Sequence, residues 1–247
     1  MNRTAHITTF LATAIATSSM AYAHEKGNLI LRAGPALVEP NEESTSIRIN
    51  QPDLGYVYGA KVGIDNDVQL GLTATYMMTD KIAIGLLAAT PFTHDIVGAG
   101  AISGVGKLGE TMHLPPTLTA QFFLADPEDK FQPYIGAGIN YTTFFNEETT
   151  QTLTDSIGVL ASLAQTPVDG VVATSTKLKL DDSFGAALEL GFDFALTENI
   201  GLNASFWYID IETEAKITAQ TNVGEVRAST DVKIDPYVYF VGLSYTF

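Results

Sequence analysis

The sequence predicts an all-β protein, a transmembrane antiparallel up-and-down β-barrel of eight strands with long extracellular loops and short periplasmic turns. Three observations carry this prediction: period-two alternation, an export sequence at the start, and long and short connections that alternate along the chain. The alternation is clearest in the last segment, where one face is apolar and rich in aromatic residues: Tyr237, Tyr239, Val241, Leu243, Tyr245 and Phe247. Because neighbouring side chains of a strand point to opposite faces, this face suits contact with lipid.

The first 23 residues have the layout of a secretory signal peptide. Arg3 precedes a short apolar core at 7–16, and Ala21-Tyr22-Ala23 is a small-x-small cleavage site. The apolar core is too short to span a bilayer, which argues against an uncleaved anchor. We therefore expect residues 1–23 to be a cleaved signal peptide, residues 24–247 to form a single barrel domain, and the protein to reside in the cell outer membrane.

The composition excludes several function classes. The 247 residues contain no cysteine, so disulfides do not hold the fold. With 13 basic and 28 acidic residues, the chain carries a net charge of −15 and lacks the clustered lysines and arginines that bind nucleic acid. We expect no nucleic-acid partner. The acidic clusters favour a solvated surface, with cation-bridged contact to anionic lipopolysaccharide as the alternative, so the expected partners are outer-membrane lipid and lipopolysaccharide.

Eight segments have the length and alternation of tilted membrane strands, and we predict strands at 29–38, 66–78, 82–91, 115–125, 131–145, 181–195, 199–212 and 230–247. The links at 79–81, 125–130 and 196–198 are short and carry turn residues. The links at 39–65, 92–114, 146–180 and 213–229 are long. Long and short links therefore fall on opposite sides of the sheet, and an even strand number places both termini in the periplasm.

Two strands fix which side chains face inward. In 66–78, Leu70 and Leu72 alternate with Gln69 and Gly71, and the apolar set suits lipid. In 181–195, the aromatic and aliphatic residues alternate with a set that contains Glu189 and Asp193. A carboxylate facing hydrocarbon is costly, so both carboxylates are predicted to point into the lumen.

Alternation along the other strands predicts an apolar collar above a polar floor. An eight-stranded barrel is narrow, with room for its own side chains or one small ligand. Leu87, Trp207, Val238 and Phe240 are predicted to line the middle and upper lumen as a collar. Arg32 is predicted to point inward near Glu189 and Asp193 as a luminal charge cluster that plugs the periplasmic end, with a structural brace as the alternative. An apolar constriction resists ions, which favours small hydrophobic molecules as cargo.

Several segments also match a known family. They include Ala23-His24-Glu25, Arg32-Ala33-Gly34, Gln69-Leu70-Gly71-Leu72-Thr73, Leu86-Leu87-Ala88-Ala89-Thr90-Pro91-Phe92, His113-Leu114-Pro115-Pro116-Thr117, Pro133-Tyr134-Ile135-Gly136-Ala137-Gly138-Ile139-Asn140-Tyr141 and Trp207-Tyr208-Ile209-Asp210-Ile211. In these segments, which span nearly the whole chain, the sequence resembles the OmpW family of small bacterial outer membrane proteins. The resemblance implies a narrow channel that assists small hydrophobic molecules across the outer membrane and closes at Leu87 and Trp207. Two alternatives stay open: these residues only fill the core, or the barrel is a non-transporting anchor or surface receptor that displays its loops.

The remaining motifs give weaker predictions. The link at 146–180 contains Leu153, Ile157, Leu160 and Leu163 at helical spacing, which indicates either a helix that caps the barrel rim or a mobile lid that contacts ligand. His94, Asp95, Ser103 and His113 fall in or beside the second long link without the spacing of a catalytic triad. Two histidines without further ligands are poor support for a metal site. We expect no enzyme activity, no cofactor and no metal.

Overall fold

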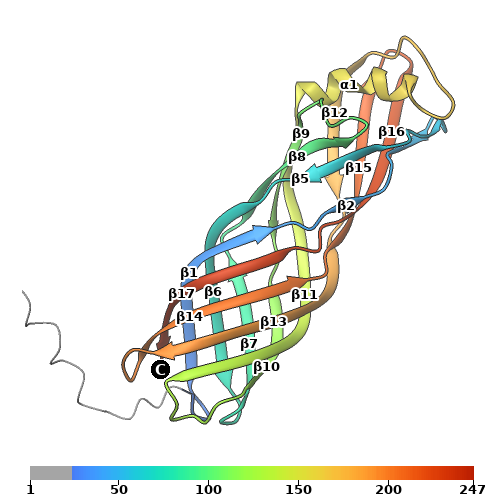
Figure 1. Cartoon of the computed structure of the whole chain (residues 1–247). Coiled ribbons are helices and arrows are strands. Elements are labelled where there is room, and N and C mark those ends of the chain that lie inside the picture. The colour runs from blue at the N-terminus through green and yellow to red at the C-terminus, as the bar shows by residue number, and fades with distance from the viewer. Residues whose placement is uncertain (1–23) are drawn as a thin grey trace, which may run out of the picture.

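Eight antiparallel strands close into a barrel in the computed structural model, which describes residues 24–247 (Figure 1). The predicted signal peptide at 1–23 lies outside the described residues. Strand β10 pairs with β11, and the first strand pairs with the last, so the sheet has no free edge around the barrel. The barrel strands are β1 (Leu29–Glu39), β6 (Asp67–Met77), β7 (Ile82–Ala89), β10 (Thr117–Phe123), β11 (Phe131–Thr149), β13 (Ser183–Ala195), β14 (Ile200–Ile209) and β17 (Tyr237–Thr246). The predicted fold class is confirmed.

Alternation along these strands sorts the side chains as predicted. Outward positions are exposed and apolar, as at Leu70, Leu86, Leu190 and Leu243. Inward positions on the same strands are buried. The short links lie at the end of the barrel that holds the C-terminus, where the backbone N–H of Phe247 donates to the carbonyl of Leu29 over 2.9 Å (Figure 1). We call this end the terminal end.

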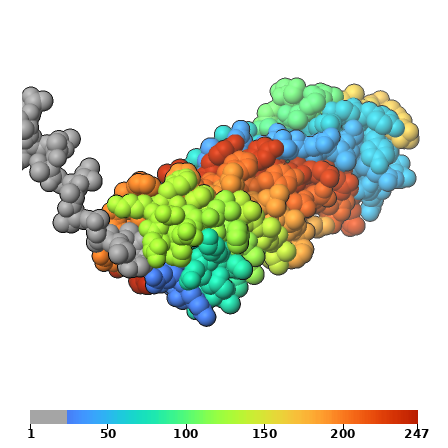
Figure 2. Space-filling view, turned by 60° about the horizontal axis from the view of Figure 1, so that its bottom comes forward, coloured from blue at the N-terminus to red at the C-terminus, as the bar shows by residue number. Residues whose placement is uncertain are grey.

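The long links form ordered structure at the other end, where loops were predicted. Part of this distal extension continues the barrel wall from β11 through β9, β8 and β5, and part is a second sheet of six strands in which β15 and β16 are central. Its elements are β2 (Glu43–Ser44), β3 (Arg48–Gln51), β4 (Gly55–Tyr56), β5 (Ala60–Ile64), β8 (Phe92–Gly100), β9 (Lys107–Leu114), β12 (Ala173–Leu180), β15 (Glu212–Thr221) and β16 (Gly224–Lys233). The space-filling view shows barrel and extension as one elongated body (Figure 2).

Helix α1 (Gln151–Ser162) lies across the distal end of the extension (Figure 1). The hydroxyl of Thr150 caps it by accepting the N–H of Leu153 over 3.2 Å. Leu153, Ile157 and Leu160 are buried at the predicted helical spacing, whereas Leu163 ends the helix and is 57% exposed. The helix therefore caps the extension, above the rim of the barrel itself. No helix among residues 24–247 is long and apolar enough to cross a membrane.

The predicted strand at 230–247 is wrong in one respect, because the structure divides it into two strands. Strand β16 ends at Lys233 and β17 begins at Tyr237. Between them Asp235 adopts a φ of 36°, a conformation that strands do not use, and Pro236 has no N–H to donate to a ladder. The chain turns here from the extension into the barrel wall.

Candidate functional site: the luminal column

An ion pair between Arg32 and Asp193 closes the lumen near the terminal end. The guanidinium donates from Nε to Oδ1 over 2.8 Å and from Nη2 to Oδ2 over 2.5 Å, which is the two-point geometry of a strong arginine–carboxylate pair. Asn203 also donates to Oδ1 over 2.9 Å, and the Nε2 of His24 lies 3.0 Å from Oδ2. Arg32 and Asp193 are 2% and 3% exposed, so each charge depends on the other.

The predicted third member of the cluster, Glu189, joins it through intermediates. The guanidinium Nη1 of Arg32 donates to the hydroxyl of Thr75 over 2.7 Å, and that hydroxyl donates to Gln121 over 3.1 Å. The amide of Gln121 then donates to Glu189 over 2.8 Å, and Thr119 donates to the same carboxylate oxygen over 3.1 Å. The ion pair with Arg32 belongs to Asp193, and Glu189 sits one layer higher. We call this whole network the polar floor.

Tyr134 and His24 also belong to the polar floor, and neither was identified as a member from the sequence. The ring of Tyr134 lies 5.5 Å from the guanidinium carbon of Arg32, and its hydroxyl is 3.2 Å from the amide nitrogen of Asn203. Its inward position follows from the alternation of β11, so this contact could have been found. His24 precedes every strand and has no periodic context, and only the fold shows where it lies.

The predicted collar residues come together above the polar floor. Leu87, Trp207, Val238 and Phe240 are all buried in one apolar cluster. Trp207 on β14 lies opposite Val238 on β17, and its indole N–H donates to Ser205 over 3.1 Å. The pairing of these strands brings the indole to the same cluster as Leu87 of β7. The collar is in place, and its control of passage stays a prediction.

Four aromatic rings form a neck above the collar, where the barrel meets the extension. Phe92 and Phe144 lie 5.4 and 5.8 Å from the ring of His113 by centroid, at interplanar angles of 29° and 27°. His94 lies 4.9 Å from His113, with their two Nε2 atoms 2.9 Å apart. Both histidines are buried. Across the part of the chain that the structure describes, no three metal-ligating side chains gather in a metal site.

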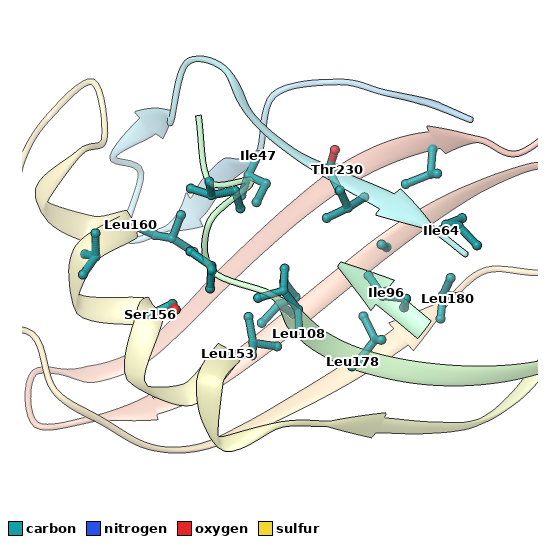
Figure 3. Close-up of a pocket in the computed structure, with 18 residues that line it drawn as sticks. Ile47, Ile64, Ile96, Leu108, Leu153, Ser156, Leu160, Leu178, Leu180 and Thr230 are labelled. Atoms are coloured by element: carbon teal, nitrogen blue, oxygen red, sulfur yellow. The ribbon is translucent and has the colours of Figure 1, made fainter. Parts of the chain in front are cut away.

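An apolar cavity of about 100 Å³ lies above the neck, beneath helix α1 (Figure 3). Figure 3 shows aliphatic side chains from the helix and from both sheets turned toward it. Ser156 and Thr230 are the hydroxyl-bearing residues of this lining. The aliphatic lining includes Ile47, Ile96, Leu108, Leu153, Leu160 and Ile217. The volume suits a few carbon atoms, because one water occupies roughly 30 Å³ of liquid.

The barrel wall loses its ladder at one level between the collar and the neck. The pairing of β7 with β10 ends at Leu87 and Thr117, and the pairing of β8 with β9 begins at Phe92 and His113. The segments in between contain Pro91, Pro115 and Pro116, which have no N–H groups to donate. The flanking strands remain joined, as by the N–H of Thr90 to the carbonyl of Leu70 over 2.9 Å. We call this interruption the proline gap.

Comparison with known proteins gives a family match over nearly all of the described chain. The model of the OmpW family covers residues 25–247. Outer membrane protein W of Vibrio cholerae is 40% identical over 232 residues, or 94% of each chain. The crystal structure of OprG from Pseudomonas aeruginosa is similar with a TM-score of 0.78 at 38% identity, covering 92% of this chain and 98% of OprG. The dibenzothiophene metabolism operon protein PahQ of Pseudomonas aeruginosa is 22% identical over 175 residues, covering 70% of this chain and 68% of PahQ.

The polar floor predicts unequal effects of two carboxylate substitutions. Asp193→Asn leaves the buried charge of Arg32 without a counter-ion and should lower the free energy of unfolding by about 3–5 kcal/mol. Glu189→Gln keeps an oxygen that accepts from Thr119 and Gln121, so it should cost less than about 1 kcal/mol. Urea unfolding in lipid vesicles measures both values, and equal losses would contradict the assignment of the ion pair to Asp193.

The neck predicts an acid-sensitive extension. Burial lowers the pKa of His94 and lowers that of His113 to about 3, below the ordinary value of 6.5. Above pH 6.5 both the folded and the unfolded chain hold these rings neutral, so stability does not depend on them. As the pH falls from 6.5 toward 3, the unfolded chain binds protons that the folded chain does not, and the extension loses stability.

Hydrogen exchange of the β8 and β9 amides, corrected for the intrinsic pH dependence of exchange, measures this loss. Protection should fall below pH 6.5 while that of β10 in the barrel stays constant. The double variant His94→Phe/His113→Phe keeps the rings and removes the titrating nitrogens, so its extension should hold its protection over the same range. An equal fall in the double variant would assign the effect to other groups.

Proposed function

Because this chain belongs to the OmpW family of outer membrane proteins, and its barrel therefore lies in the outer membrane, we propose that it is a narrow channel that assists the passage of small hydrophobic molecules. In such barrels the termini and short turns face the periplasm. The polar floor then lies toward the periplasm, and the extension with its cavity stands outside the cell.

One observation carries the proposal: a column of apolar layers runs from the cavity down to the collar. Ile96 lines the cavity and lies two residues from His94 on the same face of β8, and Phe92 and Leu87 follow below. Small apolar molecules lose little on entering such layers, whereas ions would lose their hydration without compensation. PahQ, by its name, belongs to an operon for metabolism of dibenzothiophene, an apolar compound, and this supports the same class of cargo.

The exit we propose is sideways through the proline gap. The polar floor is a closed network of charged and amide groups, which an apolar molecule would have to break at high cost. The proline gap lies at the upper edge of the collar, directly beyond Leu87, where no ladder continues the pairing of β7 with β10. A cargo molecule that reaches the collar therefore has a route into the membrane.

Two other classes fit the structure less well. A non-transporting anchor or receptor needs no apolar cavity above a collar, although the extension would serve for display. Catalysis is the other class: among residues 24–247, the hydrogen bonds of His94 and His113 run to each other and to the carbonyl of Asp65, so neither ring is paired with a nucleophile. We therefore propose passage without chemistry.

The collar is tested by paired alanine variants. Leu87→Ala and Trp207→Ala remove bulk from the lumen, so uptake of the apolar dye N-phenylnaphthylamine by cells carrying them should rise by roughly three- to tenfold, a barrier change of about 1 kcal/mol. Leu86→Ala and Phe206→Ala are matched controls, because these neighbours face lipid. Uptake unchanged by the luminal variants, in barrels shown to be folded, would favour the anchor or receptor.

The proposed exit route predicts that a collar substitution raises the uptake of apolar molecules without raising ion conductance. In planar bilayers, Leu87→Ala should show no more ion conductance than the parent, because the polar floor still closes the lumen below the collar. The same variant should take up more dye in cells. Conductance that rises together with dye uptake would mean that the collar, rather than the polar floor, blocks a straight path.

A further inference from the structure

The hydrogen bonds of the neck fix where its protons lie. The Nδ1 of His94 is 2.6 Å from the backbone carbonyl oxygen of Asp65, and a carbonyl only accepts, so this Nδ1 carries a proton. In the neutral ring the Nε2 of His94 is then an acceptor. The Nε2 of His113 lies 2.9 Å away and must donate to it. The proton of His113 is therefore on Nε2.

This assignment leaves the Nδ1 of His113 as an unprotonated acceptor. It is buried, and no partner for it occurs among residues 24–247. The ring is stacked between Phe92 and Phe144, so apolar surface surrounds the acceptor. An unsatisfied acceptor in such a place costs free energy that a matching donor recovers.

We propose that the Nδ1 of His113 binds the hydroxyl group of a small apolar molecule, an alcohol or a phenol, on its way through the column. The inference rests on the proposed function for the delivery of that molecule to the neck. The nearest rings are aromatic, which suits an uncharged donor, and the neighbouring carboxylate of Asp67 is already engaged by the N–H groups of Val68 and Thr93. The apolar body occupies the cavity above the neck, whose lining includes Ile96 and Leu108, and the acceptor orients the hydroxyl.

The same geometry disfavours other ligands. An ionised carboxylate or phosphate offers only acceptor oxygens, so it forms no hydrogen bond with the unprotonated Nδ1 of His113. A metal ion at Nδ1 would lack further ligands, because no three metal-ligating side chains gather among residues 24–247. A pure hydrocarbon fits the apolar layers and leaves the acceptor unsatisfied, so it should bind more weakly than an alcohol of the same shape.

Nitrogen NMR of the protein in lipid nanodiscs, with 15N-labelled histidine, tests the site directly. Phenol and toluene have similar shapes, and only phenol carries a donor. Phenol should move the Nδ1 resonance of His113 upfield from the position of a free acceptor, and toluene should not. His24 also has an unpartnered Nδ1, below the collar, and serves as a control that stays unchanged. An Nδ1 that is already hydrogen-bonded without phenol and does not respond to it would overturn the inference.

Affinity of the two probes gives a second, independent measurement. Titration followed through the methyl resonances of Ile96 and Leu108 should show phenol bound more tightly than toluene, by roughly tenfold for one buried hydrogen bond. His94→Phe keeps the ring of His113 but removes the Nε2 acceptor that holds the proton of His113 on its own Nε2, so this variant should show a weakened preference. His94→Phe/His113→Phe keeps both stacked rings without an acceptor and should lose it, and a preference that survives in the double variant would overturn the inference.

These measurements fail separately from those of the proposed function. If phenol binds at His113 but cells with the protein take up no more dye than cells without it, the binding site is supported and the proposed channel function is contradicted. If the collar variants change dye uptake and the His113 resonance does not respond to phenol, the proposed channel function is supported and the proposed hydroxyl-binding site is contradicted.

Discussion

Closure of the barrel with only eight strands is the constraint on which the rest of this molecule depends. A backbone in hydrocarbon must satisfy its hydrogen bonds internally, and closing the sheet achieves this without an edge. Eight strands also make the lumen so narrow that inward side chains from opposite walls touch. Residues far apart in the sequence therefore meet in layers, as Arg32 meets Asp193 and as Leu87 joins the cluster of Trp207.

The layers of the lumen differ in chemistry. The polar floor closes the terminal end, and apolar residues line the lumen above it. Arg32 can be buried at the terminal end because Asp193 receives it at two points and the surrounding amides and hydroxyls use the remaining groups. Such a network resists both ions and apolar molecules. Above it the ladder of the wall is interrupted between the collar and the neck, where the chain carries three prolines. The closed floor and the interrupted ladder above it are the two observations on which the proposed lateral route rests.

The sequence alone was enough for the barrel and for much of the site, because lipid imposes a strict alternation. The apolar face of 66–78 and the carboxylates of 181–195 fixed the inward register, and the collar and Arg32 followed from the same rule. The extension was taken for loops because its strands alternate apolar residues with threonine, lysine and serine that face water, as in β12 and β16. In the sequence such segments resemble polar links, because periodicity does not reveal the sheet that buries their apolar face.

The neck could not have been predicted, because it depends on register between strands. His94 and His113 are 19 residues apart, and only the pairing of β8 with β9 brings their Nε2 atoms to 2.9 Å. The position of Phe144 depends in turn on the pairing of β9 with β11. Periodicity indicates which face a side chain takes and leaves open which neighbour it meets. Which of the two histidines donates to the other depends on a further contact, the one between the Nδ1 of His94 and the backbone carbonyl of Asp65.

A single acceptor within apolar layers suits a channel better than a chain of polar groups would. Passage requires that a molecule enter readily and also leave, so no site along the path can bind it tightly. One buried hydrogen bond contributes about 1 kcal/mol net, which changes occupancy severalfold without trapping the cargo. Because Phe92 and Phe144 hold His113 by stacking, the acceptor stays in place while molecules exchange. In the channel proposed above, the neck would then discriminate between apolar molecules before the proposed release through the proline gap.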